Sequence, residues 1–437
     1  MTYDMGQRSL PDLLHTLQHV DAVHGLYYVF MHGVFAVFGD SLVVLRLPSA
    51  LAMAAAAAGV GAIGCRLVGP RAGTAAGIIF SLLPLVQHYA QEGRSYAVVC
   101  ATVTWATWLF LKAVEQPVRA VWFGYTAMAL LACLLHEFAV LALVAHGVTL
   151  LWSRAPVAVI KAWACAAICV TAFLAPLALF SIRQSEQVSW ISGPQPVALA
   201  TCALGALLAH PKLSGTLPRA GGVRLRELAL PLLLLPSTAL LLTTPIKPLY
   251  VDRYVLYSMV GLALLAGVAL EHVLRRARSH RRTVQLVLCA LVATATAVPL
   301  GIYERTPRSR IDDVHAITST VALSASPGDG LIFTPARRRV WVGTNSSAFR
   351  GLDDLALREG PRGSRSLYGR ELPIGTVRAR MLAARRIVVL SDPPSQPEDR
   401  SLREATKREV LRKHFTVCRR SDIHGARVTV YARPNDC

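Results

Sequence analysis

Long apolar runs alternate with short polar connections over the first three hundred residues of the chain. The runs are rich in Ala, Leu, Val and Gly. A bilayer core needs about 20 apolar residues per helix, and small residues allow close packing of helices in lipid. The pattern predicts about ten membrane-spanning helices, at 46–67, 72–89, 96–114, 119–135, 138–153, 158–181, 196–210, 228–243, 254–274 and 284–303.

The segment before the first of these runs has a different pattern. Leu10, Leu13 and Leu17 recur at helical spacing beside polar residues, which indicates an amphipathic helix on the outer membrane surface. Residues 23–38 are apolar but too short for an ordinary span, which favours a juxtamembrane helix. We therefore expect outer-face helices over 1–45, followed by a transmembrane core over 46–303.

The last part of the chain is polar by comparison. Residues 304–437 carry 40 charged side chains, whereas the 303 residues before them carry 32. This indicates a small α/β domain in water. We expect its elements at 312–324 (helix), 331–334 (strand), 386–391 (strand), 398–413 (helix) and 415–418 with 428–431 (closing strands). Residues 335–383 give no clear signal.

The composition excludes a soluble enzyme and a disordered chain. Only 16% of the residues are charged and 53% are hydrophobic, whereas soluble proteins carry about 25% charged residues. The net charge of +20 does not indicate a nucleic-acid partner, because the basic residues cluster in alternate connections between the apolar runs. Cys418 and Cys437 lie in the polar tail, where they could form a disulfide outside the cell.

The basic residues also predict the orientation. Five alternate connections carry 15 Lys and Arg, and the opposite ones carry four: Arg94, Arg183, Lys247 and Arg253. Cytoplasmic loops are enriched in Lys and Arg. We therefore expect a multi-pass protein of the cell membrane with an extracytoplasmic C-terminal domain.

Polar and ionisable residues gather at the predicted external ends of the helices. Such groups are costly near lipid and are therefore candidates for function. They are Asp21, His24, Glu92, Arg94, Tyr96, His136, Glu137, Lys247, Arg253 and Tyr254. Structural roles stay open for each: Glu92 could pair with Arg94, and Lys247 and Arg253 could anchor a helix at the interface.

Three motifs resemble those of the polyprenyl-phosphate-sugar-dependent glycosyltransferases of the GT-C fold, in particular the family 39 protein-mannosyltransferase-like group. They are Asp21 with Leu26-Tyr27-Tyr28, then Phe38-Gly39 and Ser41 with Leu45-Arg46-Leu47-Pro48-Ser49-Ala50, then Gln91-Glu92 with Arg94 and Tyr96. Arg253-Tyr254 resembles a later motif. The resemblance covers residues 8–305, and His24-Gly25 departs from the Pro-Pro that is usual in the family.

The resemblance implies inverting transfer of a hexose, expected to be mannose, from a polyprenyl monophosphate to a hydroxyl of a protein, glycan or lipid. Glu92 and Asp21 are then the candidate catalytic carboxylates. The other external residues would bind substrate: His24, Arg94, Tyr96, His136, Glu137, Lys247, Arg253 and Tyr254. The sequence assigns no metal ligand, and the participation of a divalent cation stays open. The donor is already activated, so no nucleotide is required, and no Gly-rich phosphate loop is seen.

Two other interpretations remain. A transporter or flippase for a lipid-linked sugar would show broken helices in inverted repeats, but no repeat is visible. The chain could also be an inactive, truncated membrane protein. Members of the family carry an Asp-Glu pair after their first transmembrane helix, and the resemblance here begins after that point. We therefore expect that an N-terminal helix with this pair is missing.

Overall fold

The computed structural model describes residues 1–184, 196–210, 219–220, 222–276, 298–310, 312–344, 346–434 and 436–437. Contacts divide the chain into two units. The membrane unit is Asp21–Gly301, and the α/β unit combines Met1–Val20 with Ile302–Cys437. The expected outer-face segment 1–45 is thus divided between the two units, whereas the expected boundary near residue 304 lies close to the observed one.

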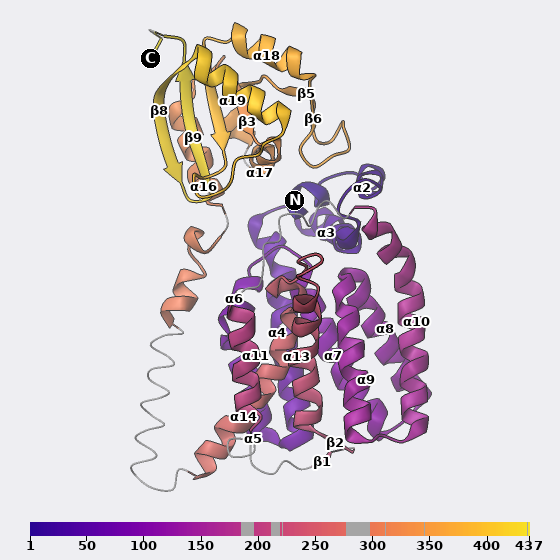
Figure 1. Ribbon diagram of the computed structural model, residues 1–437. Helices are drawn as coiled ribbons and strands as arrows, with labels where there is room; N and C mark the ends of the chain where they lie inside the picture. Colours follow the sequence, from indigo (N-terminus) through magenta and orange to yellow (C-terminus); the bar gives the residue numbers. More distant parts are fainter. Residues whose placement is uncertain are drawn as a thin grey trace. The chain divides into compact units, whose positions relative to one another are not determined.

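The membrane unit is a bundle of helices (Figure 1). Its elements are η1 (Ala22–His24), α3 (Gly25–Phe38), α4 (Leu42–Val68), α5 (Pro70–Leu82), α6 (Pro84–Tyr89), α7 (Tyr96–Glu115), α8 (Arg119–Leu135), η2 (Glu137–Ala139), α9 (Val140–Ser153), α10 (Val157–Ile182), α11 (Pro196–Leu208), β1 (Arg219–Ala220), β2 (Val223–Arg224), α13 (Leu225–Leu242), η4 (Asp252–Ser258) and α14 (Met259–Arg276).

Among the described residues, five helical segments are long and apolar enough to cross a membrane: α4, α7, α10, α13 and η4 with α14. Shorter apolar helices lie between them, α8 and α9 among them. The mainly helical, membrane-type fold is therefore confirmed, and the number of ten crossings stays a prediction. Most of the last expected span, 284–303, lies outside the described residues.

The expected helix 72–89 is wrong as a single element, because it breaks at Pro84 into α5 and α6. Proline disfavours the helical conformation in the residue before it, and Leu83 accordingly is extended, with ψ 129°. Proline itself is tolerated in the first turn of a helix. The break separates the short helix α6 from α5, and α6 leads into the turn before α7.

Helices α4 and α5 pack closely through glycines. A Cβ added to Gly73 would lie 2.3 Å from the backbone nitrogen of Cys65, and one added to Gly64 would lie 2.7 Å from the Cα of Gly73. Only glycine fits at such an approach. The small residues that the sequence shows in these runs therefore do pack helix against helix.

The α/β unit contains a five-stranded sheet in the order β4-β3-β7-β9-β8. Strand β3 is parallel to β4 and β7, and β9 is antiparallel to β7 and β8. Its strands are β3 (Gly330–Thr334), β4 (Asp353–Asp354), β7 (Arg386–Ser391), β8 (Thr416–Ile423) and β9 (Ala426–Ala432); β5 (Leu357–Glu359) and β6 (Arg370–Glu371) form a separate pair.

Helices cover both faces of this sheet and form two apolar cores. On one face lie α16 (Val314–Ser324), α17 (Val340–Thr344) and η7 (Ser346–Phe349), and on the other α18 (Ile374–Ala383) and α19 (Leu402–His414); η5 (Pro307–Ser309) and η6 (Ala336–Arg339) are short turns. The expected α/β architecture is confirmed. Residues 335–383, which gave no signal, supply α17, α18 and the short strands. Cys418 and Cys437 form a disulfide.

The N-terminal helices α1 (Thr2–Gly6) and α2 (Leu10–Leu17) belong to the α/β unit. Arg8 is buried between them, where it pairs with Asp4 at 2.7 Å and donates to the carbonyl oxygen of Ser366 at 2.8 Å. Leu13 on α2 is fully buried. The amphipathic helix expected here exists, but its apolar side has a protein partner that the sequence did not indicate.

Candidate functional site

The predicted site residues come from segments that meet at one end of the membrane unit. These segments are the start of η1, the turn 90–95 between α6 and α7, the α8–η2 junction and the start of η4. The basic connections lie at the other end, where Arg66 of α4 pairs with Glu115 of α7. Helix α7 joins the two ends with 20 residues, which corresponds to roughly 30 Å, the thickness of a bilayer core.

The carboxylate of Asp21 lies at the centre of a buried polar group. It accepts a hydrogen bond from the hydroxyl of Tyr28, and its Oδ2 lies 3.8 Å from Nη1 of Arg94. The same guanidinium nitrogen donates to the Tyr28 hydroxyl at 3.0 Å. Asp21 has a left-handed backbone (φ 60°), which aspartate tolerates better than most residues. This turn directs the chain into η1 and α3.

The surroundings of Asp21 favour its ionised form. Burial alone would raise the pKa of this carboxyl, but the charges of His24 and Arg94 and the hydrogen bond from Tyr28 outweigh burial and lower it. Asp21 therefore remains an anion that holds Arg94 in place.

The turn that carries Glu92 and Arg94 is fixed against α4. The buried hydroxyl of Ser49 donates to the carbonyl oxygen of Glu92 at 2.6 Å and contacts that of Arg94 at 3.3 Å. Gly93 lies against Leu45, since an added Cβ would be 2.6 Å from the Leu45 Cγ. Two of the sequence motifs, Leu45 to Ala50 and Gln91 to Tyr96, are therefore one structural unit.

Glu92 contributes a carboxylate to the same region. Its negative charge acts on Arg94 and on Arg253. Its Oε2 atom is buried and makes no hydrogen bond with any residue that the structure describes. A buried carboxylate oxygen without a hydrogen-bond donor costs free energy. Such an oxygen is suited to accept a hydrogen bond or a proton from a substrate.

Aromatic and imidazole rings line the other side of this group. The ring centroids of Tyr96 lie 5.7 Å from His24, 5.6 Å from His136 and 6.1 Å from Tyr254. His24 Nδ1 lies 3.2 Å from the Ser95 hydroxyl, whereas the buried Nδ1 of His136 has no hydrogen-bond partner among the described residues.

Arg253 lies at the edge of these rings. Its guanidinium carbon is 5.7 Å from the ring centre of Tyr96 and 5.6 Å from that of Tyr254, distances typical of cation–π contacts. The neighbouring Asp252 accepts a hydrogen bond from the Tyr89 hydroxyl at 2.9 Å. The start of η4 is thereby attached to α6.

The structure brings together eight of the ten residues that the sequence proposed: Asp21, His24, Glu92, Arg94, Tyr96, His136, Arg253 and Tyr254. Glu137 instead accepts a hydrogen bond from Ser181 on α10 at 2.7 Å. Lys247 lies between α13 and η4, and its part in the site stays a prediction.

Sequence reasoning missed the roles of three residues. Tyr28 bridges Asp21 and Arg94, Ser49 holds the turn, and Tyr89 holds Asp252. Tyr28 and Ser49 lie inside the quoted motifs, and that was the one available signal.

No metal centre is evident in the part of the chain that the structure describes. No group of three or more His, Cys, Asp or Glu is placed there to hold an ion. The participation of a divalent cation therefore stays untested.

Comparisons with known proteins give the fold. Residues 26–179 match the sequence model of a family described as dolichyl-phosphate-mannose-protein mannosyltransferase. The structure is similar to ArnT from Cupriavidus metallidurans in the apo state, with a TM-score of 0.53 and 13% identity over 93% of this chain and 87% of that chain. No curated protein matches the sequence.

Two further structures are similar at a lower level. ArnT bound to undecaprenyl phosphate has a TM-score of 0.46 and 12% identity over 93% of this chain and 87% of that one. The oligosaccharyltransferase AglB from Archaeoglobus fulgidus, in complex with an inhibitory peptide and a dolichol-phosphate, has a TM-score of 0.43 and 12% identity over 86% of this chain and 61% of that one.

Proposed function

We propose that this chain is a GT-C glycosyltransferase that transfers a hexose from a polyprenyl monophosphate to an acceptor hydroxyl at the extracytoplasmic face of the membrane. Mannose is the sugar we propose first, because the family that matches residues 26–179 is named for a lipid-phosphate mannose donor. The acceptor is a hydroxyl of a protein, glycan or lipid.

One observation carries this proposal. Two arginines and two carboxylates, Arg94, Arg253, Asp21 and Glu92, gather at one end of a bundle of apolar helices. A lipid monophosphate donor needs cations for its phosphate and a carboxylate for the acceptor proton. It also needs both groups at membrane level, where its lipid chain lies.

The reaction is a single displacement. The acceptor oxygen attacks C1 of the sugar, the bond between C1 and the phosphate oxygen breaks, and the acceptor proton passes to a carboxylate. Arg94 and Arg253 stabilise the phosphate monoester that leaves. Attack opposite to the leaving group inverts the configuration at C1.

The two carboxylates have different roles in this proposal. Asp21 is held by Tyr28 and Arg94, and its lowered pKa makes it a weak proton acceptor. We assign it the positioning of Arg94. Glu92 has a buried oxygen without a partner among the described residues, so we assign it the acceptor proton.

The proposal can be tested in proteoliposomes with polyprenyl-phosphate-mannose. Consumption of the donor and labelling of a membrane extract measure transfer before the acceptor is identified. Glu92→Gln should lower kcat by roughly 10²–10⁴, the range for loss of a general base. Arg94→Gln and Arg253→Gln should each lower kcat/KM by about 10- to 100-fold through lost charge-assisted contacts to phosphate.

Glu271→Gln is the matched control, because it makes the same chemical change far from the site. Glu271 lies in the last turns of α14, where it pairs with Arg275. The variant should leave transfer unchanged. Movement of the lipid-linked sugar across the bilayer without transfer would instead identify a flippase. Failure to use any lipid-phosphate hexose would contradict the proposal.

A further inference from the structure

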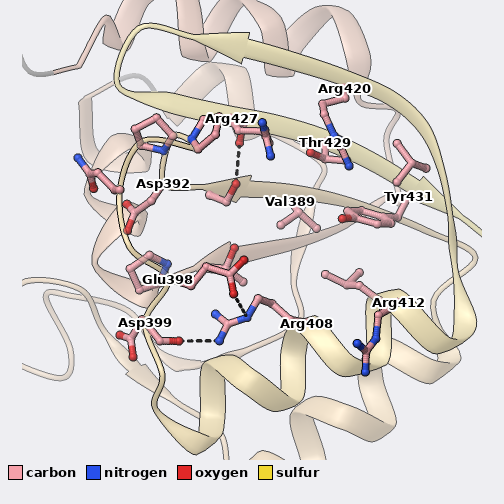
Figure 2. Close-up of a pocket in the computed structure, with 18 of the residues that line it drawn as sticks. Val389, Asp392, Glu398, Asp399, Arg408, Arg412, Arg420, Arg427, Thr429 and Tyr431 are labelled. Carbon is pink, nitrogen blue, oxygen red and sulfur yellow. Dashed lines mark hydrogen bonds and ion pairs between the residues drawn. The ribbon is translucent and has the colours of Figure 1, made fainter.

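The α/β unit has a groove beside helix α19 that the proposed transfer reaction does not use. The groove encloses about 640 Å³, within the range of roughly 300–1,000 Å³ that is typical of small-molecule sites. Helix α19 packs over β3 and β7 through Val410, Leu411 and Phe415. The same face of β9 and β8 continues past the helix and forms the floor (Figure 2).

Sheet register determines which side chains form this floor. Val389 of β7 pairs with Thr429 of β9, which pairs with Arg420 of β8, so all three project from one face. Tyr431 lies in the next row, opposite Ile387 and Val417. The floor therefore combines an aromatic ring, a hydroxyl and a guanidinium.

The hydroxyl of Thr429 is the informative group on this floor. Thr429 is 3% exposed and lines the groove. Within the described chain its hydroxyl makes no hydrogen bond, and the residue borders the open space of the groove. The hydroxyl can therefore donate to, or accept from, a polar ligand in the groove.

Two arginines on opposite walls of the groove are available to an anion. Arg412 of α19 and Arg420 of β8 make no hydrogen bond or ion pair within the described chain, and Figure 2 shows them on either side of Tyr431. Arg408 differs, because it donates to the carbonyl of Asp399 at 2.6 Å and pairs with Glu398 at 3.3 Å.

Carboxylates lie at the other end of the groove, at the carboxyl end of β7. Asp392 and Asp399 line the groove there, after the parallel strand ends. Both oxygens of Asp392 are already paired, with Arg337 and Arg338, so Asp399 is the carboxylate that a ligand can use. Carboxylate oxygens accept hydrogen bonds from the hydroxyls of a sugar. One end of the groove thus fits an anion, and the other end fits hydroxyl groups.

The loop after β7 argues against a nucleotide. It contains Pro393, Pro394 and Pro397, which lack the backbone N–H groups that bind phosphates in nucleotide loops. We infer that this groove binds a sugar that carries an anionic group, a phosphate or a carboxylate. In this arrangement Arg412 and Arg420 bind the anion, the ring of Tyr431 contacts an apolar face of the sugar, and Thr429 and Asp399 bind its hydroxyls.

The inference is tested by binding to the full chain in nanodiscs, measured by calorimetry and by saturation-transfer NMR. The probes are mannose 6-phosphate, glucuronate, unmodified mannose, inorganic phosphate and a tetraglutamate peptide. Mannose 6-phosphate or glucuronate should bind at least tenfold more tightly than mannose or inorganic phosphate, and the stronger of the two identifies the anion.

Variants separate the groove from the general positive charge of the unit. Arg412→Gln and Arg420→Gln should each weaken binding of the acidic sugar about tenfold, and Thr429→Val about fivefold. Arg419→Gln is the matched control: Arg419 is adjacent on β8 but pairs with Val430, whose side chain lies in the core on the other face. It should bind normally.

Three results would overturn the inference. They are equal binding of the acidic sugars and mannose, tighter binding of tetraglutamate or inorganic phosphate than of any sugar, and equal affinity in Arg419→Gln and Arg420→Gln. Sugar transfer is not part of the measurement, so failure here leaves the proposed function untouched.

Discussion

The hydroxyl of Ser49 lies 2.6 Å from the carbonyl oxygen of Glu92, and this contact joins two motifs that are 43 residues apart. It holds the turn that carries Glu92 and Arg94 against α4. The position of both side chains therefore depends on a buried serine that touches neither of them.

Replacing Ser49 should disturb the site without removing any charged group. Ser49→Ala leaves the Glu92 carbonyl without this donor, which should lower the free energy of unfolding by about 1–2 kcal/mol and reduce transfer. Thermal unfolding in detergent and the donor-consumption assay measure the two effects. Ser81→Ala is the control, because Ser81 is exposed and bonds to Ile78 within its own helix; equal effects of the two variants would contradict this role.

Gly93 should be required for the position of the turn 90–95, because the side chain of Leu45 leaves no room for a Cβ there. Gly93→Ala places a Cβ 2.6 Å from the Leu45 Cγ, which forces the turn or the leucine to move and should cost roughly 1–3 kcal/mol. Leu45→Ala in the same chain removes the obstacle, so the double variant should regain transfer that Gly93→Ala loses. If the double variant is no better than Gly93→Ala, the contact does not set the position of the turn.

Tyr28→Phe should change the pH dependence of stability. The pKa of Asp21 is lowered in the folded chain, so its ionised form stabilises the fold above the unfolded pKa, and this stabilisation is lost as pH falls through the folded pKa. Removing the Tyr28 hydroxyl raises the folded pKa. The acid loss of stability should then be smaller and should be complete at a higher pH.

Unfolding temperatures between pH 7 and pH 3 test this prediction. Tyr27→Phe is the control, since it removes a hydroxyl from the same helix and leaves the bond to Asp21 in place. Identical pH profiles for Tyr28→Phe and the unmodified chain would contradict the proposed bond.

Arg8 should stabilise the α/β unit from outside its sheet. Arg8 is 2% exposed and bonds to Asp4, Thr16 and Ser366. Arg8→Gln should destabilise the unit by roughly 2–3 kcal/mol, less than for a fully buried pair because the Asp4 side chain is partly exposed. Faster proteolysis of the unit would show this. Arg362→Gln, which breaks only an exposed bond to Gln7, should have no such effect.

Orientation can be checked with single cysteines at exposed positions, in a chain whose seven cysteines outside the Cys418–Cys437 disulfide are replaced. Ser395→Cys in the α/β unit should react with a membrane-impermeant reagent on intact cells. Gln116→Cys, after α7, should react only once the cells are opened. Both side chains are exposed in the structure. The reverse pattern would move the proposed site to the cytoplasmic face.

Local sequence signals were sufficient for many elements. Helix α8 begins and ends where the apolar run 119–135 does, and β7 coincides with the predicted strand 386–391. These elements are delimited by polar or chain-breaking neighbours, so hydrophobic periodicity alone locates them. Pro84 also indicates the break between α5 and α6, but the apolar run continues through it, so hydropathy alone predicts one helix.

The sequence by itself determined that the chain has a helical membrane part, a separate α/β part and a set of polar residues at one end of the helices, because hydropathy and charge are local properties. Only the tertiary structure decided that Arg94 lies beside Asp21, that Ser49 holds the turn of Glu92, and that Met1–Val20 belongs with the C-terminal residues. Each of these depends on contacts between segments far apart in the chain, and such contacts leave no periodic signal in the sequence of either segment.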